Sequence, residues 1–249
     1  MTASAATAVQ VETSPKRVRI YLSGELVADT RGALLVWEIP YYPVYYVPAA
    51  DVRAELIPAG RERVPELGEA EILHVKVATA TAELAARRYP DSPVPQLRDA
   101  VRFTWSSMSE WLEEDEPVYV HARDPHKRVD ILASSRHVRI EIDGVTVAES
   151  RQPRILFETS LPPRYYLPLA DVRMDLLRPS ATATSCPYKG TAAYWSVDTG
   201  QGVHADVVWV YRAPLPESQK VAGLACFYNE KVSIYLDGEL QPQPQTPFS

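Results

Sequence analysis

Residues 17–57 read RVRIYLSGELVADTRGALLVWEIPYYPVYYVPAADVRAELI, and residues 137–177 read HVRIEIDGVTVAESRQPRILFETSLPPRYYLPLADVRMDLL. At a constant offset of 120 and with no gap, 17 of these 41 positions are identical. Chance identity, at about one position in twenty, would give roughly two. The chain therefore contains two homologous units, and whatever fold one of them adopts is predicted for the other.

The repeat continues past this stretch with small changes of length, and it divides the chain. We assign a first unit to residues 15–112, a joining segment to 113–136 and a second unit to 137–240. The joining segment is too apolar for a flexible linker, so we expect it to pack across both units. Residues 1–14 are small and polar and residues 241–249 are rich in proline and glutamine, so we expect both ends to be disordered.

The local pattern predicts strands. Residues 17–22 alternate polar and apolar side chains, and Asp143-Gly144 in the second copy is a hairpin signal. The 22 prolines, spread over short segments, argue against a helical bundle. One short helix is predicted over 216–224, with a proline near its first turn, and a counterpart over 95–100. Each unit is thus predicted to be a small, mainly antiparallel β-domain with a short helix, and we expect an approximate two-fold relation between the two.

Composition limits the function classes. A net charge of −6 over 249 residues argues against an electrostatic nucleic-acid binder, which needs a concentrated positive surface. No run of about 20 apolar residues predicts a membrane span. Two cysteines supply neither a disulfide framework nor a CxxC zinc site. We therefore expect a cytoplasmic protein without a bound metal or cofactor, and a monomer that is an internal pseudo-dimer.

Five blocks of the second unit carry a family resemblance. They are VRIEIDGVTVAES, LPPRYYLPLADVRMDLL, TSCPYKGTAAYWSV, a WVY segment and an ACFYNEKV segment, in that order between Val138 and Val232. These blocks resemble the domain of unknown function 427 family, and the CPYKG block followed by Tyr-Trp is the specific part. The resemblance implies a β-rich, tent-like fold and a tandem two-copy member. The family is sometimes labelled nucleotidyltransferase-like, but the chain has no convincing acidic metal-ligand pair for such chemistry.

The two copies differ most at the CPYKG turn. The second unit has Cys186-Pro187-Tyr188-Lys189-Gly190, and the first unit has VPELG at 64–68. Proline and glycine recur, which indicates a requirement of the backbone. The side chains of Cys186, Tyr188 and Lys189 do not recur, so the first copy is interpreted as a scaffold that has lost its pocket.

Lys189 is the predicted catalytic or ligand-binding residue of that turn. Its ammonium group can bind an anion or, if desolvated, act as a nucleophile or base. The alternative is an exposed lysine in a structural turn. Treated as a surface residue, Lys189→Met is predicted to cost about 0.5 kcal/mol of stability.

Aromatic side chains are predicted to line the same pocket, beside the thiol of Cys186. Trp195 and Trp209 are specific to the second copy, and for them a ligand-facing role and β-core packing are equal readings, whereas Tyr166 recurs in the first copy, which favours a structural role. The ligand-binding set is Cys186, Tyr188, Lys189, Trp195, Trp209, Tyr211, Tyr166 and Arg173. Arg173 and Asp171 recur in both copies, which favours an ion pair or cap, with Glu158 as a further carboxylate partner for Arg173.

Three functions remain open from the sequence. The first is an uncharacterised small-molecule binding protein with an aromatic- and lysine-lined pocket in the second unit. The second is an enzyme that uses Lys189 on a nucleotide-like or phosphorylated substrate. The third is a structural or interaction module without a ligand.

Overall fold

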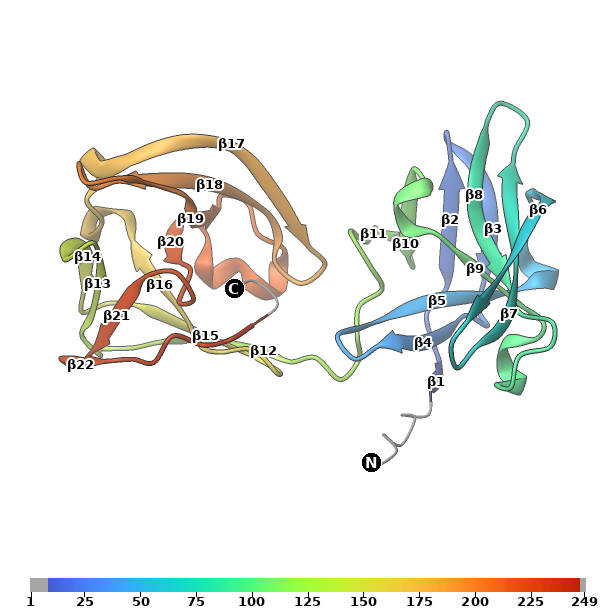
Figure 1. Cartoon of the computed structure of the whole chain (residues 1–249), viewed down its shortest axis with the longest axis horizontal. Coiled ribbons are helices and arrows are strands. Elements are labelled where there is room, and N and C mark those ends of the chain that lie inside the picture. Colours follow the sequence, from blue (N-terminus) through green and yellow to red (C-terminus); the bar gives the residue numbers. More distant parts are fainter. Residues whose placement is uncertain (1–8, 247–249) are drawn as a thin grey trace. The chain divides into compact units, whose positions relative to one another are not determined.

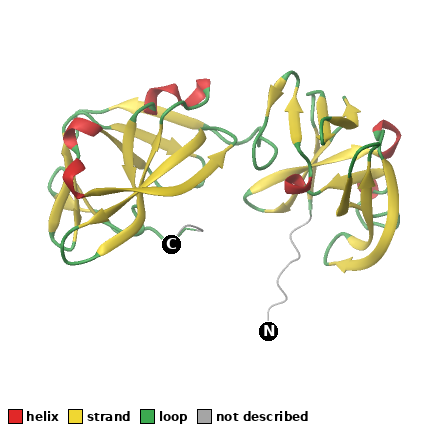
Figure 2. Cartoon of the chain, turned by 90° about the horizontal axis from the view of Figure 1, so that it is seen from above, coloured by secondary structure: helices red, strands yellow, loops and turns green. Residues whose placement is uncertain are grey.

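The chain forms two compact units, Met1–Asp124 and Pro125–Ser249, and the computed structural model describes residues 9–246. Both units are built mainly from antiparallel strands, with a few short 3₁₀ helices (Figures 1 and 2). Within residues 9–246 no helix is long and apolar enough to cross a membrane.

The first unit has two sheets. In spatial order, the seven-stranded sheet contains β1 (Gln10–Thr13), β4 (Leu34–Ile39), β5 (Tyr42–Pro48), β9 (Ala100–Phe103), β8 (Thr81–Arg88), β7 (Gly68–Lys76) and β6 (Glu55–Val64). The four-stranded sheet contains β11 (Glu116–Pro117), β10 (Glu110–Glu113), β2 (Val18–Leu22) and β3 (Glu25–Thr30). The 3₁₀ helices are η1 (Ala49–Asp51), η2 (Pro95–Leu97) and η3 (Trp105–Ser107).

The second unit repeats this topology strand for strand. Its seven-stranded sheet contains β12 (Val129–Ala133), β15 (Arg154–Glu158), β16 (Arg164–Pro168), β20 (Leu224–Phe227), β19 (Val203–Tyr211), β18 (Gly190–Asp198) and β17 (Leu177–Cys186). Its four-stranded sheet contains β14 (Val145–Ser150), β13 (Val138–Ile142), β21 (Ser233–Leu236) and β22 (Glu239–Leu240). The 3₁₀ helices are η4 (Leu169–Asp171), η5 (Met174–Leu176) and η6 (Pro216–Val221). The predicted mainly β, tandem architecture is therefore confirmed.

The unit boundaries differ from those drawn on the sequence, because each unit begins one strand earlier. Residues 10–13, expected to be disordered, form β1 and pair with β4. The equivalent strand of the second unit, β12, lies in the expected joining segment and pairs with β15. The other end of that segment contains β11, which pairs with β10. Both first strands precede the part of the repeat in which the two copies match strongly.

The described residues of the C-terminal tail make hydrogen bonds to the second unit. Residues 241–246 have no regular secondary structure, yet the amide of Gln241 donates to the carbonyl of Ile234 at 2.8 Å. Thr246 Oγ1 donates to Glu230 at 2.6 Å. The remaining residues of the expected tails, 1–8 and 247–249, lie outside the described residues.

Local sequence explains the turns. Ser23-Gly24 and Asp143-Gly144 both have positive φ at the two central positions, as a two-residue hairpin turn of type I′ requires. The predicted helix over 216–224 is the shorter η6, which begins at Pro216 and ends at Val221. It ends there because Gly223 takes a φ of +71° and Leu224 starts β20.

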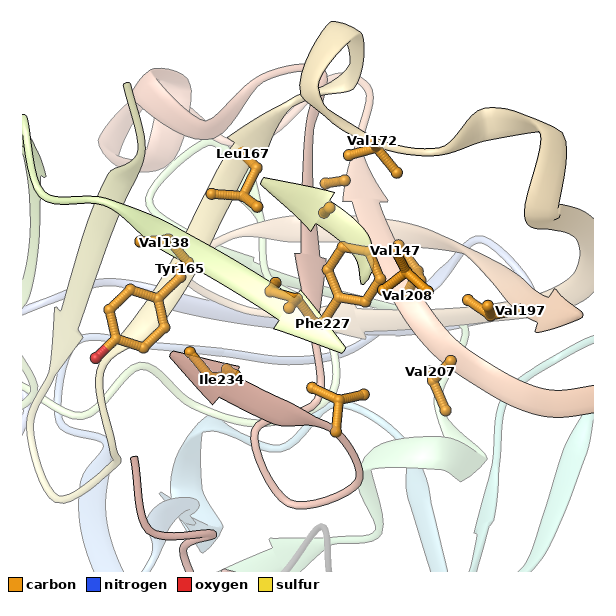
Figure 3. Close-up of a cluster of buried hydrophobic side chains, with 14 of the residues drawn as sticks. Val138, Val147, Tyr165, Leu167, Val172, Val197, Val207, Val208, Phe227 and Ile234 are labelled. Carbon is orange, nitrogen blue, oxygen red and sulfur yellow. The ribbon is translucent and has the colours of Figure 1, made fainter. Parts of the chain in front are cut away.

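The core of the second unit lies between its two sheets. Alternate residues of each strand point inward, as the two-residue period of a strand dictates. Val138 and Ile140 from β13 meet Leu167, Val208 and Phe227 from the larger sheet, and all are buried. Figure 3 shows Val138, Leu167, Val208 and Phe227 within this cluster of buried side chains.

The opposite face of each seven-stranded sheet, which we call the outer face, carries the intervening residues of the same strands. In the first unit this face is mainly aliphatic, with Val36, Leu67, Ala70, Leu97 and Ala100 beside two tyrosines. In the second unit it is rich in aromatic residues, including Tyr166, Tyr194, Trp209, Tyr211 and Tyr228. The outer face is therefore where two otherwise equivalent units diverge.

Candidate functional site

The CPYKG turn connects β17 to β18 at the outer face. Cys186 pairs with Gly190, so the three residues between them form the loop. Gly190 has a φ of +91°, and a Cβ there would lie 3.4 Å from the backbone nitrogen of Leu215. Gly68 in the first unit has a φ of +98° and is equally crowded, by Pro93. Glycine is thus required for the backbone at both turns, as the sequence indicated.

Lys189 lies on this loop, and it is not a surface residue. Its ammonium group forms an ion pair with the carboxylate of Glu158, the last residue of β15. The two side chains are only 12% and 9% exposed. Removing the amine would leave a carboxylate largely buried and unpaired, so the expectation of a cost near 0.5 kcal/mol is corrected upward.

In the first unit, the carboxylate equivalent to that of Glu158 has a different cationic partner. Glu38 occupies the position of Glu158, and its partner is Arg102 of β9, at 3.1 Å. In the strand pairing of the first unit, Arg102 lies opposite Tyr46. In the second unit, Cys226 lies opposite Tyr166, the equivalent of Tyr46. Arg102 and Cys226 therefore occupy equivalent positions. The carboxylate therefore recurs in both units, while its cation comes from a central strand in one and from a turn in the other.

A second buried ion pair on the outer face is specific to the second unit. Each terminal nitrogen of Arg164, on β16, donates a hydrogen bond to one carboxylate oxygen of Glu230, at 2.7 Å. The side chains are 9% and 0% exposed. Asn229 accepts a further hydrogen bond from the same guanidinium at 3.2 Å. The positions of Arg164 and Glu230 are occupied by Val44 and Ser106 in the first unit, so no ion pair forms there.

Aromatic rings surround Arg164. Its guanidinium carbon lies 5.7 Å from the ring centroid of Trp209 and 6.0 Å from that of Tyr228. Trp209 donates its indole N–H to Tyr166 at 3.2 Å, and the two rings meet edge to face. The hydroxyl groups of Tyr194 and Tyr228 share one hydrogen bond at 3.2 Å. We call Arg164, Glu230, Trp209, Tyr228 and Tyr194 the Arg164 cluster.

The pKa values of Glu230 and Cys226, both in this region, are shifted in opposite directions. Burial of Glu230 raises its pKa, but hydrogen bonds from Arg164 and Thr246 outweigh this, and the net pKa is below the ordinary value. Burial raises the pKa of the Cys226 thiol to about 12, although the nearby cations of Arg164 and Lys189 oppose the shift. Cys226 is thus protonated at neutral pH and is a packing residue rather than a nucleophile.

The structure brings together only part of the predicted pocket. Tyr166, Trp209 and Tyr211 share the outer face with the Lys189–Glu158 pair. Trp195 follows Tyr194 on β18 and therefore packs on the opposite face, against the inter-sheet core. Its ring lies 6.0 Å from the guanidinium of Arg212, away from Trp209.

The other predicted residues lie at the edges of this region. Cys186 and Tyr188 are half-buried in the turn, and the backbone carbonyl of Tyr188 accepts a hydrogen bond from Ser218 at 3.0 Å. Arg173 is exposed and pairs with Asp175 at 2.6 Å, not with Asp171 or Glu158. Asp171 accepts from the hydroxyl of Ser150 instead. The expected Asp171–Arg173 pair is therefore wrong.

Sequence reasoning missed Arg164 and Glu230. A usable signal existed, because Arg164 falls in the ungapped part of the repeat, opposite Val44, on a strand that otherwise reads as apolar. Glu230 could not be paired with it from the sequence, since 66 positions separate them. Among residues 9–246 no group of three or more His, Cys, Asp or Glu side chains is placed to hold a metal ion.

Fold and site together define a tandem antiparallel β protein in which one of two equivalent units carries a charged, aromatic outer face. A family model described as domain of unknown function (DUF427) matches residues 10–114 and 130–238. The chain belongs to this family and contains two copies of its domain. Both matches begin at the first strand of a unit, β1 or β12. A search of curated proteins found no match.

Proposed function

We infer that this protein binds a small molecule and that the second unit carries the binding site, on its outer face. One observation carries the proposal: the buried Arg164–Glu230 pair and a group of aromatic rings occupy a face that is mostly aliphatic in the first unit. The first unit reaches the same topology without the Arg164–Glu230 pair, so the fold does not need it. Buried charge is costly, and hydrophobic replacements are often as stable or more so. Its retention in one unit is therefore best explained by a role in binding.

The half-buried side chains indicate where a ligand would enter. Lys189, Tyr188 and Tyr228 are each partly accessible, whereas Trp209 and Tyr166 are buried. A ligand with a planar ring and a polar group suits this combination, because the rings offer stacking and the ion pairs offer hydrogen bonds. The expected partners are thus a small molecule and no nucleic acid. The free thiols of Cys186 and Cys226 are consistent with a reducing cytoplasm.

The test is a binding screen on the full chain by thermal shift and ligand-observed NMR, with adenosine monophosphate, glucose 6-phosphate and phenylalanine as probes. Lys189→Arg is the variant to compare, because it keeps a cation beside Glu158 and so avoids the unfolding that Lys189→Met would risk. A matched control is Arg102→Lys, which makes the same class of change beside Glu38 in the first unit. Binding that Lys189→Arg weakens and Arg102→Lys does not supports the proposal. Equal effects, or no binding of any probe, would leave a structural module as the better reading.

A second candidate is an enzyme acting on a nucleotide-like or phosphorylated substrate. The observation that favours it is the direct contact between the ammonium group of Lys189 and the carboxylate of Glu158, since such a pair can exchange a proton with a bound substrate. Turnover of a bound probe that is abolished in Glu158→Gln, with binding retained, would support this candidate over simple binding.

The tandem arrangement also bears on assembly. One chain already contains two equivalent units, as a homodimer of single-unit chains would. We therefore propose that the protein is monomeric. Light scattering after size exclusion should then give a mass near 27.8 kDa.

A further inference from the structure

A cavity opens at one end of the seven-stranded sheet of the second unit. Four strands contribute to it: β12 and β20 with β15 and β16 between them. Its volume is about 560 Å³, within the range of about 300–1,000 Å³ usual for small-molecule sites. Its lining residues are Ala133, Ser134, Ser135, Arg151, Gln152, Pro153, Arg154, Pro168 and Leu224. We call it the Arg151 groove.

The charge of this groove is positive and uncompensated. Arg151 and Arg154 are its only ionisable residues, and no acidic residue lines it. Every other arginine described in the second unit has a partner: Arg128, Arg136, Arg139, Arg164, Arg173 and Arg178 pair with carboxylates, and Arg212 faces the ring of Trp195. Within residues 9–246 neither Arg151 nor Arg154 makes a side-chain hydrogen bond, ion pair or ring contact.

The rest of the lining suits an organic anion. A guanidinium group donates in a planar fork that matches phosphate and carboxylate oxygens. Ser134 and Ser135 add hydroxyl groups beside the arginines. Pro153, Pro168 and Leu224 provide an apolar wall for the remainder of the ligand. The three kinds of surface together match a small apolar or aromatic group that carries one anionic head.

The first unit lacks this combination. At the offset of 120, Arg151 corresponds to Arg31, but Arg154 corresponds to Leu34 and Ser135 to Pro15. Leu34 packs against the apolar cluster of the first unit's outer face. The pair of cations is therefore specific to the second unit, as is the Arg164 cluster.

The groove is distinct from the Lys189 region. Arg154 begins β15 and Glu158 ends it, so the two positions are four residues apart. At about 3.3 Å per residue this is about 13 Å along the strand. A ligand head held by the two arginines thus does not contact the Lys189–Glu158 pair, and this inference stands without the proposed function.

The geometry points to the Arg151 groove as a binding site for a small organic anion, a phosphate monoester or a carboxylate. Arg151 and Arg154 hold the anionic head, the serine hydroxyls donate to it, and the proline-leucine wall covers the apolar part. The site is a property of the second unit alone.

The experiment uses the full chain and three matched probes: phenyl phosphate, benzoate and phenol. Amide NMR titration of the wild-type protein should shift the signals of Ser134, Ser135 and Gln152 with either anion and leave them unmoved with phenol. The double variant Arg151→Gln/Arg154→Gln should weaken anion binding at least tenfold, since two charged hydrogen-bond donors are lost. Arg31→Gln, the equivalent change in the first unit, is the control and should leave the affinity within twofold. Tighter binding of phenyl phosphate than of benzoate identifies a phosphate site, and the reverse order identifies a carboxylate site.

Three results would overturn the inference. Shifts confined to residues outside the groove would place anion binding elsewhere. An unchanged affinity in the double variant would show that the arginines do not hold the head, and spectra of the unliganded variant establish that it is folded. Equal weakening by Arg31→Gln would show a general effect of net charge. Trp209→Phe separates this inference from the proposed function, because it alters the outer-face aromatic group and should leave phenyl phosphate binding unchanged.

Discussion

Replacement of Lys189 by methionine should destabilise the second unit by about 3 kcal/mol. The ammonium group of Lys189 is the ion-pair partner of Glu158, and the two side chains are 12% and 9% exposed. Breaking a buried pair by removing one partner costs about 3–5 kcal/mol, because the remaining charge is desolvated without compensation. The small residual exposure of both groups places the expected value at the lower end of that range.

Native-state hydrogen exchange measures this change one unit at a time. A loss of about 3 kcal/mol should speed the exchange of the most protected amides of β16 and β18 by about 150-fold, since about 1.4 kcal/mol corresponds to a factor of ten. The amides of β5 and β7, in the first unit, serve as the internal reference. The double variant Lys189→Met/Glu158→Gln removes both charges and should recover about half of the loss.

Two outcomes would refute this reasoning. A cost within about 0.5 kcal/mol would show that Glu158 is solvated well enough to remain unpaired, as at an ordinary surface site. Failure of Glu158→Gln to recover any stability would show that the cost came from lost packing of the lysine stem rather than from charge.

Three further predictions follow from features of the second unit. The Arg164–Glu230 pair lowers the pKa of Glu230, so the pair's contribution to stability is present above the unfolded pKa of about 4.5 and is lost as the pH falls through the folded value. Urea midpoints between pH 6 and 3 should therefore fall more steeply for the wild type than for Glu230→Gln, and parallel curves would contradict this. Gly190→Ala should cost about 1–2 kcal/mol or more, because φ is +91° and backbone atoms of Leu215 and Ala213 lie 3.4 and 3.5 Å from the added Cβ; Gly144→Ala, at φ +74° with open space, should cost less, and the reverse order in thermal unfolding would show that crowding at Gly190 is unimportant. The thiol of Cys226 is buried with its pKa raised to about 12, so iodoacetamide at pH 8 should label half-buried Cys186 in the native protein and leave Cys226 unmodified until denaturant is added; mass spectrometry showing early labelling of Cys226 would be inconsistent with this burial.

The fold was largely predictable because its determinants are local or repeated. Two-residue turns such as Asp143-Gly144 specify hairpins through backbone geometry alone, and the ungapped repeat transfers each such inference to the other unit. The first strand of each unit, β1 or β12, was missed because these strands share little sequence and are held by pairing with a partner more than 20 residues away. Long-range pairing of that kind leaves no short-range signal.

The site was less predictable because sheet register decides which side chains meet. Tyr194 and Trp195 are neighbours in sequence, yet the alternation of a strand sends them to opposite faces, so only Tyr194 lies with Trp209. The burial of Lys189 was unpredictable for the same reason. Its turn has a sequence typical of an exposed loop, and only the position of β15 in the sheet brings Glu158 against it. Comparison of the two copies shows the positions at which they differ, but not which of the differing residues are in contact.

The two solutions to one buried carboxylate have a consequence for the history of the duplication. Glu38 is neutralised from β9 by Arg102, and Glu158 from the CPYKG turn by Lys189. Exchange of β9 for β20 between the halves would leave one hybrid with two cations against a single acid and the other with none. Exchange of the turns alone would produce the same mismatch in reverse. A crossover between the duplicated gene segments that separates these positions would therefore leave one product with a carboxylate that has no cationic partner.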